Sequence, residues 1–168
     1  VVGLGWMVAL FWRLVAASPA EDRLHAKVIG VGGLVGWLSL AGACVALFAD
    51  ASLVGRACVL TGLWGFVVVT YVTVAHRMIP FFTSSAVPMV AVWRPFWVLW
   101  GLLSAAALEA VAVWVDGSGI PGGEAGRAWM LLRGLLELTA GGVVLWLAVA
   151  WGLVQSLSQN SPDNALQW

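Results

Sequence analysis

Long apolar runs constrain this chain more than any other feature, because they are long enough to cross a lipid bilayer. A membrane-spanning α-helix needs about 20 apolar residues, and the runs that reach or approach this length are residues 1–17, 28–48, 57–75, 89–115 and 127–155. Lipid cannot hydrogen-bond the backbone, so each run must satisfy its own backbone groups as an α-helix. Charged residues make up only 10% of the chain, against roughly 25% in a soluble domain. The sequence therefore predicts an all-α fold, a polytopic transmembrane helical bundle with about five spans.

The bundle is expected to occupy residues 1–155, and residues 156–168 are expected to form a polar tail or a truncated loop. Val1 already lies inside an apolar run, which indicates that the bundle is an incomplete part of a longer protein. Its expected partners are therefore the lipid bilayer and the remaining spans of the same protein. The formal net charge is zero and the sequence carries no nucleic-acid recognition motif, so we expect no nucleic-acid partner.

Positive residues are distributed unequally between the two sides of the predicted bundle. The second and fourth connections share one side, which carries Arg56 and Arg127. The first and third connections share the other side, whose five positive residues are Arg13, Arg23, Lys27, Arg77 and Arg94. Cytoplasmic loops carry an excess of Lys and Arg. The first and third connections are therefore predicted to face the cytoplasm.

The third connection is the best candidate for a functional site. Its sequence is HRMIPFFTSSAVP, residues 76–88, and it places a histidine, an arginine and several hydroxyls at the expected edge of the bilayer. Ionisable groups at or inside a membrane are costly and tend to be functional. Pro80 and Pro88 lack amide hydrogens, so we expect them to end or kink a helix and to shape a rigid connection.

This segment, with the Trp-Arg-Pro of residues 93–95 that follows it, resembles the central segment of the NnrS family. Arg77, Ile79, Pro80 and Thr83 match the family pattern, whereas His76 stands where many members have glycine. The resemblance implies a multi-pass protein of the bacterial inner membrane that contains haem and copper and takes part in nitric oxide response or denitrification. It also implies a protein more than twice this length, of which the chain covers the middle. Neither the residues nor the resemblance names a reaction, so enzymatic activity is left open.

The two histidines are candidate ligands for a metal or for haem. His25 opens the second predicted span and His76 closes the third, so antiparallel neighbours place both at one membrane face. Neutral imidazole is a common ligand for copper and haem iron. Thr70 and Thr73 share a helix face with His76 and could hydrogen-bond an imidazole or a propionate, and Arg77 could pair with a propionate. The alternatives are interfacial histidines, threonines that bond other helices, and an arginine that only sets orientation.

A second polar set lies inside the fourth and fifth spans. Glu109 and Arg133 lie at matching depths of the predicted hairpin, and Glu137 follows Arg133 by four residues on one helix face. An unpaired charge in the membrane is costly, so the three side chains are predicted to form a buried ion cluster. Such a cluster could fix the register of the two helices, or it could line a path for protons or another ligand.

Other features support packing rather than chemistry. Gly32 and Gly36 form a GxxxG pair in the second span, which is typical of close helix contacts. Cys44 and Cys58 lack the spacing of a zinc or covalent haem site, and their role as copper thiolates stays open. Two other classes of function remain beside the haem and copper protein. One is a transporter or channel that uses the Glu109 cluster, and the other is a structural subunit of a membrane complex without a cofactor.

Overall fold

The computed structural model describes residues 1–20, 23–86, 95–119 and 122–159, with the backbone alone for residues 80–86 and 151–159. Every regular element in these ranges is helical, which confirms the predicted all-α fold. The elements in chain order are α1 (Val2–Ala17), α2 (Leu24–Phe48), α3 (Ser52–Gly62), η1 (Leu63–Val68), α4 (Val69–Ala86), α5 (Phe96–Gly117) and α6 (Gly123–Gln159). The segments α3, η1 and α4 follow one another without a break and form one long helix.

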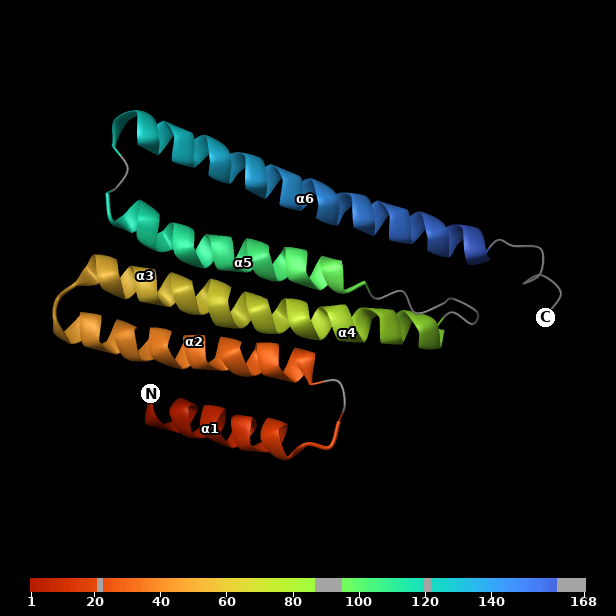
Figure 1. Cartoon of the computed structure of the whole chain (residues 1–168), viewed down its shortest axis with the longest axis horizontal. Helices are drawn as coiled ribbons and strands as arrows, with labels where there is room; N and C mark the ends of the chain where they lie inside the picture. Colours follow the sequence, from red (N-terminus) through yellow and green to blue (C-terminus); the bar gives the residue numbers. More distant parts are fainter. Residues whose placement is uncertain (21–22, 87–94, 120–121, 160–168) are drawn as a thin grey trace.

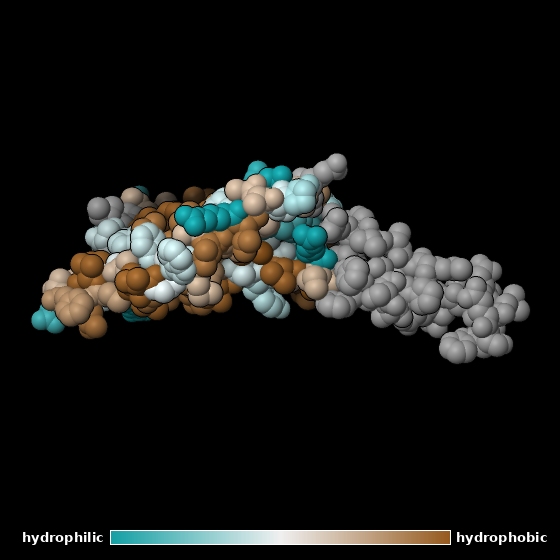
Figure 2. All heavy atoms as spheres, turned by 90° about the horizontal axis from the view of Figure 1, so that it is seen from below, coloured by the Kyte–Doolittle hydropathy of each residue, from teal (hydrophilic) through white to brown (hydrophobic). Residues whose placement is uncertain are grey.

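Among the described residues, four segments are long and apolar enough to cross a membrane, and α1 is a shorter apolar helix. The four are Leu24–Phe48, Ser52–Ile79, Phe96–Gly117 and Gly123–Ala150. The helices lie side by side in chain order, and each runs antiparallel to the one before it (Figure 1). Apolar residues cover much of the face seen in Figure 2, as expected for a surface that meets lipid. The chain is thus a multi-pass membrane protein.

A tight turn joins α2 to α3 and makes them close antiparallel neighbours. The amide of Ala51 donates to the carbonyl of Ala46 at 2.9 Å, and the amide of Asp50 points to the carbonyl of Leu47 at 3.4 Å. These bonds satisfy carbonyls that the end of α2 leaves open, in the pattern of a Schellman motif. Asp50 takes the left-handed conformation that the motif requires, with φ of 51°. A short polar side chain tolerates that conformation better than a branched one.

Small residues bring α2 into close contact with the long helix at η1. A side chain added at Gly36 would meet the ring of Phe66, with Cβ 2.7 Å from Cγ, and one added at Gly65 would meet Val35 Cγ1 at 2.7 Å. Val35 therefore packs over Gly65, and Phe66 packs over Gly36. Gly32 lies beside the same contact, where its added Cβ would be 3.3 Å from the carbonyl oxygen of Gly65. The GxxxG pair thus serves close helix packing.

The contact coincides with six residues of π-helix, Leu63–Val68. A π-turn adds a residue to the helical repeat, and each residue of an α-helix turns the chain by about 100°. The segment after η1 therefore presents a different face from the one that an uninterrupted α-helix would present. This change of face was not predicted from the sequence.

The helix that carries the proline motif extends further than predicted. Residues 57–75 were expected to form the third span, with Pro80 ending or kinking the helix, but α4 continues to Ala86. The prediction of a connection that begins at residue 76 is therefore wrong for residues 76–86, and Pro88 lies outside the described residues. Proline deprives the carbonyl four residues earlier of its helical partner and its ring crowds that carbonyl, and long membrane helices tolerate both effects.

We expect Gly36→Ala to lower the free energy of unfolding by about 1–3 kcal/mol, because the new methyl group would overlap Phe66. The loss should appear as an earlier midpoint when the protein, purified in mild detergent, is unfolded by a denaturing detergent. Gly101→Ala in α5 is the matched control, since no atom lies within 4 Å of the added Cβ, and its effect should stay within about 1 kcal/mol. Equal effects of the two substitutions would contradict the close contact at η1.

Candidate functional site

His25 and His76 meet where α2, α4 and α5 come together. His25 lies in the first turn of α2 and is 2% exposed, and His76 lies in α4. Nε2 of His25 is 3.3 Å from Nδ1 of His76, and the ring centroids are 5.5 Å apart with 22° between the ring planes. Thus two residues that are 51 positions apart in the sequence form one side-chain pair, at the same end of the bundle as predicted.

The protons of this pair can be assigned from its third partner. Nε2 of His76 is 3.1 Å from the carbonyl oxygen of Pro95. A carbonyl oxygen only accepts, so His76 must carry a proton on Nε2, and its neutral ring then presents a lone pair on Nδ1. Nε2 of His25 then donates to that lone pair. The result is a chain of two hydrogen bonds that runs from α2 through α4 to the residue that precedes α5.

Phe96 covers one side of the pair, and Thr73 lies nearby on α4. The Phe96 ring centroid is 6.0 Å from the centroid of each imidazole. Thr73 is fully buried, but its hydroxyl donates to the carbonyl of Val69 at 2.6 Å within its own helix. The Thr70 hydroxyl is buried and has no hydrogen-bond partner within the described part of the chain. The interaction of these threonines with a cofactor stays a prediction.

The second polar set comes together around Arg133 of α6. Its guanidinium lies 2.6 Å from Oε2 of Glu109 on α5 and 2.6 Å from Oε1 of Glu137 on α6. Asp116 of α5 joins them, with Oδ2 2.5 Å from Nη1 of Arg133, and also accepts from the indole of Trp129. Asp116 was not among the residues predicted for this cluster, although it lies seven residues, or two helical turns, after Glu109 and so on the same face.

The excess of carboxylates in this cluster does not by itself define a ligand site. Its three carboxylates surround one arginine, whose side chain is 26% exposed. Each guanidinium nitrogen faces a different carboxylate, an arrangement that ties α6 to α5 at the turn between them. The contacts therefore support the structural role predicted for the cluster, and the alternative of a path through it stays open.

Comparison with known proteins decides the family. The family model described as NnrS protein matches residues 1–161, nearly the whole chain. The chain belongs to the NnrS family. Among curated proteins and among solved structures, no match was found.

The residues that carry the NnrS resemblance lie on α4 rather than in a loop. Arg77 and Ile79 are exposed and directly follow His76. The backbone of Pro80 and Thr83 continues the helix, and their side chains lie outside the described set. Arg94, the second predicted cytoplasmic arginine of this region, is also outside it. The motif thus lies at the same end of the bundle as the histidine pair.

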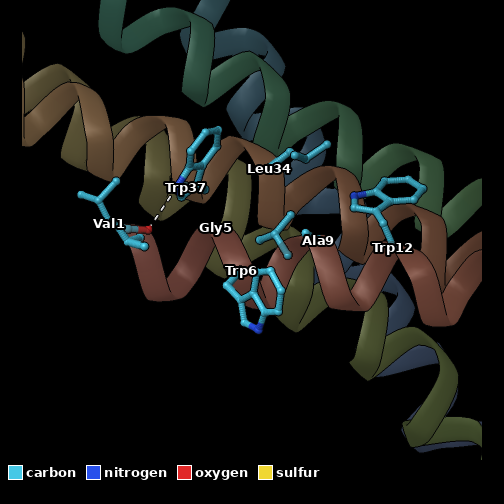
Figure 3. Close-up of a pocket in the computed structure, with 9 residues that line it drawn as sticks. Val1, Gly5, Trp6, Ala9, Trp12, Leu34 and Trp37 are labelled. Atoms are coloured by element: carbon cyan, nitrogen blue, oxygen red, sulfur yellow. Dashed lines mark hydrogen bonds between the residues drawn. The ribbon is translucent and has the colours of Figure 1, made fainter.

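An apolar groove of about 540 Å³ lies between α1 and α2 of this NnrS-family chain (Figure 3). Trp6, Trp12 and Trp37 contribute to its lining, and the Trp37 indole donates to the carbonyl of Val1 at 3.2 Å. The indoles of Trp12 and Trp37 lie against Gly30 and Gly5, where an added Cβ would be 2.9 and 2.7 Å away. The groove has no histidine, cysteine or acidic residue in its lining. It therefore offers apolar contacts rather than metal ligands.

The cysteines do not join either polar cluster. Cys44 and Cys58 are both free thiols, and Cys58 is buried beside Gly42 of α2. Within the described ranges, no group of three or more His, Cys, Asp or Glu side chains is arranged to hold a metal ion. Within those ranges, the histidine pair is therefore the candidate for a metal site.

Arg133→Ala should lower the free energy of unfolding by about 2–3 kcal/mol, since it leaves three carboxylates without their shared cation. Arg127→Ala is the matched control on the same helix, because its bond to Glu124 joins two well-exposed side chains. That change should cost less than about 1 kcal/mol. Both variants are compared by unfolding in mixed detergent micelles. An Arg133→Ala protein as stable as the control would show that the cluster does not hold α6 to α5.

Proposed function

We propose that this chain is part of a haem- and copper-associated protein of the bacterial inner membrane that acts in nitric oxide response or denitrification. Membership of the NnrS family supports the proposal. The observation that carries it is the pair of imidazoles at the meeting of three helices, with His25 buried and His76 half-buried. The positive residues Arg23, Lys27 and Arg77, of which the last two are exposed, lie close in sequence to the two histidines, and this end is proposed to face the cytoplasm.

The residues of the pair fit a metal ligand site. His76 presents the lone pair of Nδ1, and its opposite N–H is held by the carbonyl of Pro95. Metal-binding histidines commonly donate their second ring N–H to a backbone carbonyl, which fixes both the tautomer and the ring orientation. His25 can present Nε2 in the same way once its proton moves to Nδ1. Neutral imidazole is the form that binds metals.

The surroundings of the pair suit a site that excludes bulk water. His25 is almost fully buried, and Phe96 places an aromatic ring against both imidazoles. A hydrophobic shell controls solvent access to a metal and thereby its redox behaviour. Bound copper or haem would supply the redox chemistry and the affinity for nitric oxide, while the chain would orient the ligands and keep the site dry. Arg77 is proposed to pair with an anionic group of a cofactor at this end.

The proposal predicts that the protein purified from bacterial membranes retains copper and haem. Copper is measured by elemental analysis, and haem is measured by its absorption band and by extraction of the pigment. Cells that lack the gene should grow more slowly than the parent strain in the presence of a nitric oxide donor. A plasmid copy of the gene should restore growth.

A folded, helical protein that contains neither copper nor haem would overturn the proposal and favour a cofactor-free subunit. Uptake of a solute that is abolished by Glu109→Gln, again without bound metal, would favour a transporter instead. The variant Trp37→Phe serves as a control for both measurements, since Trp37 lines the groove between α1 and α2 and is not one of the proposed ligands.

A further inference from the structure

The geometry of the histidine pair points to a single metal ion as its ligand, monovalent copper, and excludes haem from this position. The inference rests on the proposed function, and it assigns one of the two proposed cofactors to named nitrogens. It uses the relative positions of His25, His76 and Phe96.

The two imidazoles face each other head-on. The two ring centroids are 5.5 Å apart. This distance is close to the sum of the 3.3 Å between the two nitrogens and the distance of each nitrogen from the centroid of its own ring. Such a sum is reached only when both nitrogens lie on the line that joins the centroids. The in-plane N–H direction of Nε2 of His25 and the lone-pair direction of Nδ1 of His76 therefore oppose each other along one line. The rings meet edge to edge rather than face to face.

Phe96 occupies the place that a haem would need. A haem held by two histidines places its macrocycle across the line between the two nitrogens, at its midpoint. The Phe96 centroid is 6.0 Å from each imidazole centroid, so it lies in the plane that bisects the pair. The haem macrocycle would lie in this plane. The Phe96 ring is so close to the midpoint that it would overlap the edge of the macrocycle. A single ion needs no room in that plane.

The opposed nitrogens also favour one kind of ion. Nitrogens bound at about 2.0 Å lie about 3.3 Å apart around a tetrahedral ion and about 4 Å apart when they are opposed. A tetrahedral ion such as zinc would require both rings to turn until their lone pairs converge, which would disturb the bond from His76 to Pro95. An ion that prefers opposed ligands requires the rings only to separate along the line that they already share. Monovalent copper readily adopts this linear arrangement with two imidazoles.

The test uses the full chain, purified in detergent and stripped of metal. It is titrated with copper(I) against a chromogenic copper(I) chelator, and in parallel with zinc(II). We expect one copper(I) per chain, bound much more tightly than zinc, and loss of this equivalent in His25→Ala and in His76→Ala. Cys58→Ser is the matched control, because it removes a buried thiol from the same bundle and should retain the copper. Circular dichroism verifies that each variant is folded.

X-ray absorption of the copper-loaded wild-type chain provides a second measurement that does not depend on variant folding. The inference predicts a shell of two imidazole nitrogens, without sulfur, and the edge shape of linear copper(I). A sulfur ligand or a tetrahedral zinc site with equal affinity would overturn it. Copper that persists in both histidine variants would also overturn it, and so would loss of haem in His76→Ala.

These outcomes separate the inference from the proposed function. Wild-type protein without copper and haem would defeat both. Wild-type protein that holds both cofactors, but keeps its copper in the histidine variants, would defeat the inference alone. If the Phe96→Ala protein acquires the absorption spectrum of haem bound by two histidines, the phenyl ring is what excludes the macrocycle from the pair. Unchanged spectra in that variant would contradict this role of Phe96.

Discussion

The close approach of α2 to the long helix at η1 is the contact on which the remaining arrangement depends. Lipid is as apolar as the helices themselves, so helix association in a membrane relies on packing and hydrogen bonds rather than on the exclusion of water. Gly36 receives Phe66, and Gly65 receives Val35. This interlocking fixes how α2 lies along the helix that carries His76. It thereby brings His25, at the start of α2, within hydrogen-bonding distance of His76.

The polar groups of the bundle are divided between the two ends of α5. At its start, Pro95 and Phe96 complete the surroundings of the histidine pair. At its end, Glu109 and Asp116 hold Arg133 of α6. The first group consists of two imidazoles beside an aromatic ring, which suits a metal ligand site. The second consists of charged side chains and ties α6 to α5. Because α5 contacts both α3 and α4, it connects the two groups through one rigid element.

Sequence reasoning succeeded where one residue type or one periodicity decides the outcome. Apolar length predicted the helices, and the four-residue spacing of Arg133 and Glu137 predicted a contact that the structure forms. It was wrong in ending the third span at residue 75, because a long membrane helix can continue past a proline such as Pro80. It missed Asp116 because the residue lies just past residue 115, where the predicted span ends. It could not find Phe96 as a neighbour of the histidines, since an apolar side chain carries no signal of its partner.

By itself, the sequence determined that lipid surrounds most of the chain, that the chain crosses it as helices, and that His25 and His76 belong to one end. These features follow from hydropathy and from the alternation of antiparallel helices, which depend on local composition. Only the tertiary structure decided which nitrogens meet, that Pro95 sets the tautomer of His76, and that Phe96 lies in the plane between the rings. Those details depend on the rotation of one helix against another. That rotation follows from side-chain packing at η1 across residues far apart in the sequence.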